Sequence, residues 1–319
     1  MNNEIILSVD LGGTNLRVSA VDRDGNILYR TRRETPRTNQ ATEIISAITD
    51  DAEVCREAVK LMGEVLAIGT VVPGTVNVEQ GIIRKAPNVP ALDGFSITEA
   101  IENKLNLPCV LENDANAAAI GENWLGASKD VENSICVTLG TGVGGGIIID
   151  GKILRGVDGT AGEIGHICVE PFGAPCGCGS HGCVEQYSSA TAVKRLALKL
   201  AGKFPNSILS EDTNFTSLEI YQAGKSGDEL ALEVFRQQGF YLGIALAGLI
   251  NVLNPEIIVI GGGAAAGWDL FLPYMIEQIK DRSYKEPAER AKIVPAQLGD
   301  DAGILGAARL AFESISVLD

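Results

Sequence analysis

Residues 5–14 read IILSVDLGGT, an apolar, strand-forming run that passes directly into a glycine turn. Two further apolar runs follow at 16–21 and 27–31, and Asp24-Gly25 separates them. Asp-Gly between apolar runs is a strong signal for a hairpin turn. The chain is therefore predicted to open with hairpin-connected strands. A helix predicted at 41–62, followed by another strand, makes this a mixed sheet with a helix on one face.

The same order recurs in the second half of the chain. Residues 134–146 read SICVTLGTGVGGG, again a strand followed by glycines. Alignment of Gly12 with Gly140 sets Asp10 opposite Thr138. A repeat at this scale predicts two similar α/β domains that face each other across a cleft.

Composition excludes several classes of function. The chain has 319 residues, a hydrophobic fraction of 45% and a formal net charge of −15. An acidic protein of this kind lacks the clustered Lys and Arg that nucleic-acid binding requires. The N-terminus has no features of a signal peptide, and the longest apolar stretch, 240–250, is too short and glycine-rich to span a bilayer. We therefore expect a soluble cytoplasmic protein, with a buried helix at 240–250 and neither nucleic acid nor membrane as a partner.

Three glycine-rich segments are candidate nucleotide-binding loops. The turn predicted at 140–146 contains G-x-G-x-x-G, but that fingerprint requires a following helix and a strand is predicted instead, which rejects a nicotinamide or flavin site. A turn between strands still presents backbone N–H groups to a phosphate, as Gly12, Gly13 and Thr14 also do. The third segment, 261–263, could accept adenine against its bare backbone. Each loop taken alone is also compatible with simple turn formation or packing.

The stretch Glu112-Asn-Asp-Ala-Asn-Ala-Ala-Ala119 lies between a predicted strand and an alanine-rich helix, at the expected domain junction. Asn and Asp cap helix N-termini, but one cap is enough, so Asn113 and Asp114 together exceed what the helix needs. A carboxylate at the carboxyl end of a strand, facing a cleft, is well placed to take a proton from an attacking hydroxyl.

Residues 176–185 read CGCGSHGCVE and hold three of the chain's seven cysteines. A disulfide would leave one of these cysteines unpaired, and C-x-C lacks the spacing of thioredoxin-type redox pairs. Three thiolates and one imidazole form a closed tetrahedral zinc set. A structural zinc ion is therefore predicted, held by Cys176, Cys178 and Cys183 and by one of the chain's two histidines, His166 or His181.

Together, several of these segments resemble the ROK family of sugar kinases, nearest to its bacterial glucokinases. The resemblance covers essentially the whole chain and is carried by DLGGT (10–14), ENDANA (112–117), GEIGH (162–166), CGCGSHGCVE (176–185) and GDDAGILGA (299–307). It implies the actin-like ATPase (ribonuclease H-like) fold of two similar α/β domains. The expected boundaries are 1–115, rejoined by about 303–319, for the smaller domain, and 116–302, including the zinc loop 166–185, for the larger one.

The resemblance also implies the activity: an ATP-dependent hexose kinase that phosphorylates the 6-hydroxyl of glucose, with Asp114 as catalytic base. The implied sugar contacts are Gly74, Asn88, Asn113, Asp114, Glu163, His166 and Glu185. Asp10 would position Mg²⁺. His166 would be the fourth zinc ligand beside Cys176, Cys178 and Cys183, and His181 would be a bystander because the family accepts any residue there. The implied contacts to phosphate and adenosine are Gly12, Gly13, Thr14, Thr138, Gly140, Thr141, Gly142, Gly261, Gly262 and Gly263.

Alternative interpretations of the sequence differ in the substrate of the kinase or in the class of function. Kinases of N-acetylmannosamine, N-acetylglucosamine, mannose or fructose share most of these motifs. The family also includes sugar-responsive repressors, which carry a DNA-binding segment before the first strand, and here the first strand begins at Ile5. A polyphosphate-dependent kinase would favour a more basic cleft. The resemblance further implies a homodimer or homotetramer.

Overall fold

The computed structural model describes residues 3–209 and 214–316, and its N-terminal half is built on a five-stranded sheet in the order β3-β2-β1-β4-β8. The first three strands are antiparallel neighbours, as predicted, while β4 runs parallel to β1 and β8 parallel to β4. Helix α1 packs against β2 and β3, and α2 packs against α1 and β8. The bounds are β1 (Asn3–Leu11), β2 (Asn15–Asp22), β3 (Ile27–Glu34), α1 (Ala41–Val59), β4 (Gly63–Val72), α2 (Ile97–Leu105) and β8 (Cys109–Asn113).

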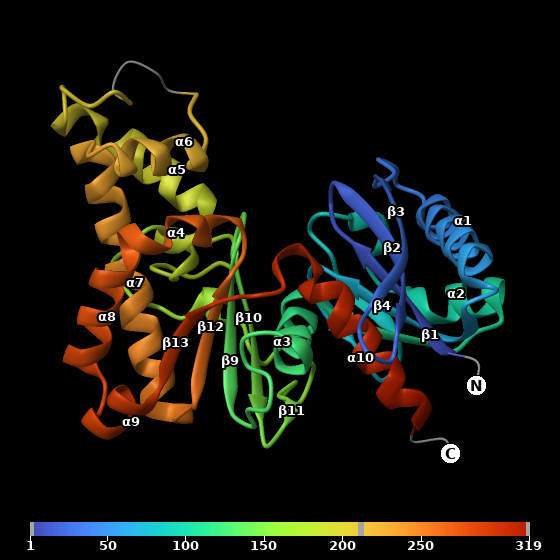
Figure 1. Cartoon of the computed structure of the whole chain (residues 1–319). Coiled ribbons are helices and arrows are strands. Elements are labelled where there is room, and N and C mark those ends of the chain that lie inside the picture. Colours follow the sequence, from blue (N-terminus) through green and yellow to red (C-terminus); the bar gives the residue numbers. More distant parts are fainter. Residues whose placement is uncertain (1–2, 210–213, 317–319) are drawn as a thin grey trace.

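The second half repeats this plan. Its sheet has the order β11-β10-β9-β12-β13, with the same succession of antiparallel and parallel neighbours. The predicted duplication of the α/β unit is therefore confirmed, and Figure 1 shows the two sheets in separate lobes. The strands are β9 (Ser134–Leu139), β10 (Val143–Ile149), β11 (Lys152–Ile153), β12 (Ile257–Gly261) and β13 (Lys292–Pro295).

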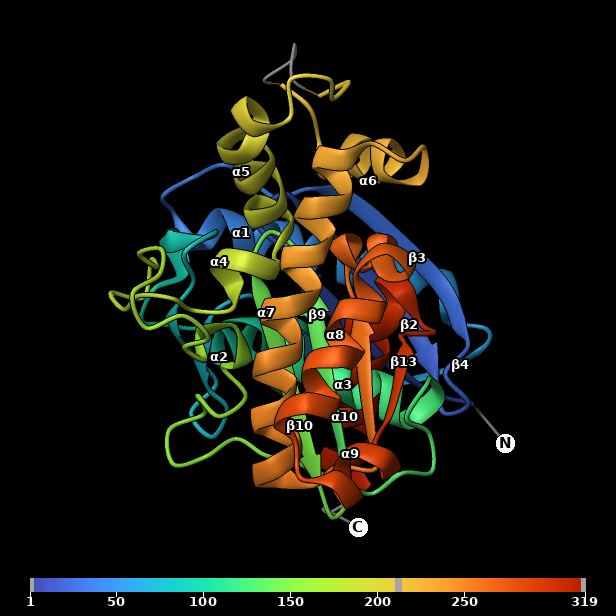
Figure 2. The ribbon, with the colours of Figure 1, turned by 90° about the vertical axis from the view of Figure 1, so that its left-hand side faces the viewer.

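Helices cover the outer face of the second sheet, with the long α7 against α8 and the α5–α6 pair at one end (Figure 2). The apolar stretch 240–250 lies inside α7, as expected for a buried helix. None of the helices in residues 3–209 and 214–316 has the length and apolarity needed to cross a membrane. The bounds are α4 (Glu185–Ser188), α5 (Ala190–Leu200), α6 (Ser217–Lys225), α7 (Glu229–Leu253), α8 (Trp268–Arg282) and α9 (Lys285–Arg290).

One predicted turn is wrong in extent. Only Gly140–Gly142 form the turn, and the glycines from 144 to 146 belong to strand β10. A Cβ on Gly144 would lie 2.9 Å from the Ala115 Cβ, and a Cβ on Gly146 would lie 2.5 Å from the Ala119 Cβ. These glycines are therefore used for packing rather than turning, because they let helix α3 (Asp114–Leu125) lie directly on the strand.

Two helices lie between the sheets. Helix α3 leaves β8 and packs on β9 and β10, while α10 (Ala302–Ser316) crosses back to pack on α3, β1 and β4 (Figure 1). Ile304 and Phe312 of α10 join Ile6 in one apolar cluster. The segment expected to rejoin the smaller domain, 303–319, thus contacts the N-terminal sheet through its described part; residues 1–2, 210–213 and 317–319 of the expected domains lie outside the described residues.

Candidate functional site

A cavity of about 570 Å³ lies between the lobes, and we call it the acceptor cavity. Its walls come from the segment just after β4, from strands β5 (Thr75–Asn77) and β6 (Ile82–Lys85), from the start of α3, and from the loops around residues 141 and 163. Strands β5 and β6 form a small sheet with β7 (Phe95–Ser96). Every residue predicted to contact sugar lines it: Gly74, Asn88, Asn113, Asp114, Glu163, His166 and Glu185. Thr138, Gly140, Thr141 and Gly142 line it as well.

Asp114 is the first residue of α3 and is exposed toward the cavity. Asn113 caps the helix, since its side-chain oxygen accepts hydrogen bonds from the backbone N–H groups of Ala115 and Asn116, and its amide donates to the Gly74 carbonyl at 2.9 Å. Desolvation by the surrounding protein, reinforced by the negative charges of Asp10 and Glu163, raises the pKa of Asp114 to about 6. A carboxyl group with this pKa is ionised at neutral pH yet basic enough to accept a proton.

The residues behind Asp114 form a network that sequence reasoning missed. Glu112 is buried, and one carboxylate oxygen lies 2.8 Å from Nε of Arg155, which follows β11. The other oxygen accepts the backbone N–H of Asn113 at 2.9 Å and the side-chain amide of Asn116 at 3.0 Å. The network thus ties the loop after β11 to the segment that carries Asp114. The sequence contains no local signal for it, because its two charged members are 43 residues apart.

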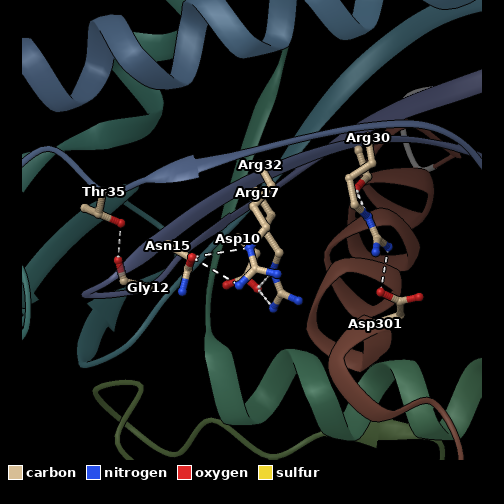
Figure 3. A network of polar contacts seen from close by, with 9 residues as sticks. Asp10, Gly12, Asn15, Arg17, Arg30, Arg32, Thr35 and Asp301 are labelled. Atoms are coloured by element: carbon tan, nitrogen blue, oxygen red, sulfur yellow. Dashed lines mark hydrogen bonds and ion pairs between the residues drawn. The ribbon is translucent and has the colours of Figure 1, made fainter.

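The first glycine turn lines a separate hollow of about 340 Å³ in the N-terminal lobe, which we call the donor hollow. Its lining residues are Asp10, Gly12, Gly13, Thr14, Asn15, Arg17, Arg32 and Asp300. Arg17 forms an ion pair with Asp10 and donates to its Oδ2 from Nε at 3.0 Å (Figure 3). Burial raises the pKa of Asp10, and Arg17 opposes that shift. The ion pair and both arginines were not predicted from the sequence.

The donor hollow and the acceptor cavity are close neighbours. A Cβ on Gly13 would lie 2.7 Å from the Cβ of Asn88, a residue of the acceptor cavity. The predicted phosphate-binding residues are therefore divided: Gly12–Thr14 lie in one lobe and Gly140–Gly142 in the other.

Only one of the three glycines predicted to contact adenosine lines the acceptor cavity. Of the three predicted glycines, Gly262 lines the acceptor cavity, whereas Gly261 does not and Gly263 lines a separate small cavity of about 50 Å³. Gly262 has a φ of +86°, and a Cβ there would lie 2.5 Å from the carbonyl oxygen of Leu139. This close approach explains the glycine at 262 structurally.

The predicted metal ligands do converge. The ligand atoms of His166, Cys176, Cys178 and Cys183 all lie within 4.8 Å of one another. The Sγ atoms of Cys178 and Cys183 are 3.7 Å apart, and Sγ of Cys176 is 3.6 Å from Nδ1 of His166. Tetrahedral zinc with bonds of about 2.3 Å to sulfur and 2.0–2.1 Å to nitrogen requires separations of about 3.8 Å and 3.6 Å. The cluster therefore fits a zinc ion.

The cluster also adjoins the acceptor cavity. Nε2 of His166 faces Glu163, at 3.9 Å from a carboxylate oxygen. Glu185 has one carboxylate oxygen 4.0 Å from Sγ of Cys176, and its other oxygen accepts the backbone N–H of Val143 at 3.1 Å. The Cys/His cluster, the start of strand β10 and the cavity wall thus share one carboxylate.

Comparison with known proteins gives a consistent result over the whole fold. The model of the ROK family matches residues 6–314. A glucokinase of Halalkalibacterium halodurans is 37% identical over 313 residues, covering 96% of this chain and 94% of the relative. A glucokinase of Thermotoga maritima is 35% identical, covering 97% and 98%.

Among solved structures, a ROK family glucokinase from Streptomyces griseus in complex with glucose and AMPPNP is similar, with a TM-score of 0.81 and 35% identity. The similarity covers 97% of this chain and 99% of that one. A ROK hexokinase from Thermus thermophilus has a TM-score of 0.83 at 31% identity, covering 98% and 99%. The fold is thus the actin-like ATPase fold that the motifs implied, and the chain belongs to the ROK family.

Proposed function

We propose that this chain is an ATP-dependent glucokinase, which transfers the γ-phosphoryl group of ATP to the 6-hydroxyl of glucose. The observation that carries the proposal is the position of Asp114: its carboxyl group, whose pKa is raised by desolvation to about 6, lies at the junction of the lobes in a cavity lined by polar side chains. The similarity to glucokinases over nearly the full chain, and to a structure holding glucose and AMPPNP, supports glucose as acceptor and ATP as donor.

In this proposal Asp114 accepts the proton of the 6-hydroxyl while the hydroxyl oxygen attacks the γ-phosphorus and the bond to ADP breaks. Phosphoryl transfer needs positioning and charge neutralisation more than covalent help from the protein. Asn113, Glu163, His166 and Glu185 supply the donors and acceptors that hold the other hydroxyls. The backbone N–H groups of the two glycine turns, 12–14 and 140–142, hold the phosphates.

Two ions belong to the proposal. Mg²⁺, when bound, neutralises charge on the transferring phosphates, and the Asp10 and Asp300 carboxylates of the donor hollow are the oxygen ligands that this ion prefers. A structural zinc ion fits His166, Cys176, Cys178 and Cys183. With Nδ1 of His166 turned toward the cluster, its Nε2 is held in a fixed direction toward Glu163 and the acceptor cavity.

The test is ADP release by the purified protein with a panel of hexoses and phosphoryl donors. Glucose with ATP is expected to give the highest kcat/KM. N-acetylmannosamine, N-acetylglucosamine, mannose and fructose are the acceptors to compare, and polyphosphate is the alternative donor. A higher kcat/KM with another hexose would reassign the substrate, and no stimulation by any hexose would refute the kinase. Assembly as a homodimer or homotetramer, and residence in the cytoplasm, stay predictions.

A further inference from the structure

Three charged side chains lie in one row across the N-terminal sheet. Asp10 of β1 is directly opposite Arg17 of β2, and Arg17 is directly opposite Arg32 of β3. Like charges opposite each other on neighbouring strands destabilise a sheet. Arg17 is compensated by its ion pair with Asp10, so the uncompensated member of the row is Arg32.

The other arginines of β3 have carboxylate partners. Arg30 pairs with Asp301 at 2.6 Å, and Arg33 pairs with Asp51. Within residues 3–209 and 214–316, no carboxylate lies at ion-pairing distance from Arg32, whose guanidinium is instead held by Oδ1 of Asn15 at 3.2 and 3.3 Å (Figure 3). Asn15 directly follows the DLGGT turn, so this contact places the guanidinium beside the proposed phosphate-binding loop.

Asp300, which lines the same hollow, also has no ion pair within the described part of the chain. Among the described residues, the donor hollow therefore presents one guanidinium and one carboxylate that lack an ion-pair partner, besides the neutralised Asp10–Arg17 pair. A ligand that complements both the guanidinium and the carboxylate must carry negative as well as positive charge, as a phosphate chain with a bound divalent cation does. Arg is well suited to the phosphate part, because its planar donors match phosphate oxygens.

We propose that Arg32 is a donor-binding residue, which contacts the β- or γ-phosphate of the metal-bound nucleoside triphosphate. The inference rests on the proposed function only for the identity of the donor. Because Arg32 lies in the hollow next to Gly12–Thr14 and outside the acceptor cavity, it acts on the phosphate chain and has no part in holding the sugar.

The test is equilibrium binding, by calorimetry on the full chain, of MgATP, AMP and glucose to the wild type and to Arg32→Gln. Loss of a charge-assisted contact predicts about a tenfold rise in the Kd of MgATP. The Kd values of AMP, which lacks both outer phosphates, and of glucose should stay within twofold of wild type. Arg37→Gln is the matched control, since it removes the same charge just after β3 at a residue that does not line the hollow, and it should leave MgATP binding unchanged.

Two results would overturn the inference. One is an unchanged Kd of MgATP in Arg32→Gln, and the other is an equal loss of MgATP affinity in Arg32→Gln and Arg37→Gln, which would mark a general charge effect. A parallel loss of AMP binding would also contradict it, because the contact would then lie outside the outer phosphates. A chain that binds MgATP through Arg32 but phosphorylates no hexose would refute the glucokinase proposal and leave this one standing.

Discussion

Asp114 is the residue on which the proposed chemistry depends, and its position explains its pKa. It starts a helix at the cavity wall, where protein replaces much of its solvent, and the charges of Asp10 and Glu163 act on it from both lobes. Each of these effects favours the neutral acid. The result is a base matched to neutral pH.

Replacement of this base gives the first prediction. Asp114→Asn should lower kcat by about 10²–10⁴-fold, since that is the usual contribution of a positioned general base. The Kd of glucose should change little, because the amide keeps the size and an acceptor oxygen. Steady-state kinetics and calorimetry on the same preparation measure both. Turnover near that of the wild type would remove Asp114 from the proposed role.

The raised pKa makes a second prediction at this residue. The carboxylate is fully present well above pH 6 and is lost as the pH falls through its pKa of about 6, so kcat/KM should fall tenfold per unit below that value. The effect on stability has the opposite sign: because the folded pKa lies above the ordinary value of 3.8, this group's stabilising contribution is lost as pH rises from about 4 to 6. A pH profile whose acid limb lies near 4 would contradict the assignment.

At the scale of the element, strand β10 is shaped by what packs on it. Its glycines leave room for α3, and α3 carries Asp114 at its first residue. Gly146→Ala should therefore push the helix away and cost about 1–3 kcal/mol of unfolding free energy, the usual cost of overpacking. Gly248→Ala is the control, because a Cβ at this helical glycine of α7 would meet nothing within 4 Å.

Urea unfolding of both variants measures this difference. Gly248→Ala should be neutral or slightly stabilising, since Ala is the better helix former. Equal stability of the two variants would show that α3 moves without cost and that the close contact has no role in placing Asp114.

The proposed zinc site, formed by His166, Cys176, Cys178 and Cys183, has a measurable consequence of its own. Metal analysis should find about one zinc per chain, and Cys178→Ala should lower Tm by several degrees and raise the KM for glucose, because the cluster orients His166 and adjoins Glu185. Cys168→Ala is the matched control, an exposed cysteine in the same loop that is not part of the cluster. A fully active protein without metal would rule the cluster out as a support of the cavity.

The sequence predicts secondary-structure elements and motifs better than it predicts which side chains face each other on neighbouring strands. Local patterns and the family motifs predict the repeated sheet, the residues that line the acceptor cavity and the convergence of the cysteines. The positions of Arg17 and Arg32 beside Asp10 could not be predicted from the sequence, because they depend on the register of three paired strands. The extent of β10 was wrong because glycine signals both a turn and a close contact, and only the neighbouring helix distinguishes them.

For the whole molecule, the division of the proposed phosphate-binding residues between the lobes has a direct consequence. Gly12–Thr14 and Gly140–Gly142 line different cavities, yet in the proposed in-line transfer both turns hold one phosphate chain. Glucose with Mg·AMPPNP is therefore expected to draw the lobes together, which also excludes water from the γ-phosphate. Small-angle scattering should show a smaller radius of gyration with both ligands than without. An unchanged radius would mean that the described arrangement is already the reactive one.

The packing of α10 on the N-terminal sheet has a consequence for folding during translation. The cluster that joins Ile6 to Ile304 and Phe312 unites strand β1 with helix α10, so the face of the N-terminal sheet that α10 covers stays open until α10 has been synthesised. At about 5–20 residues per second, the stretch between the end of β8 and the start of α10 takes a ribosome about 10–40 s to translate. Throughout that interval the nascent sheet presents apolar side chains, Ile6 among them, that α10 has yet to cover. The growing polypeptide is therefore a natural client for chaperones that act at the ribosome exit.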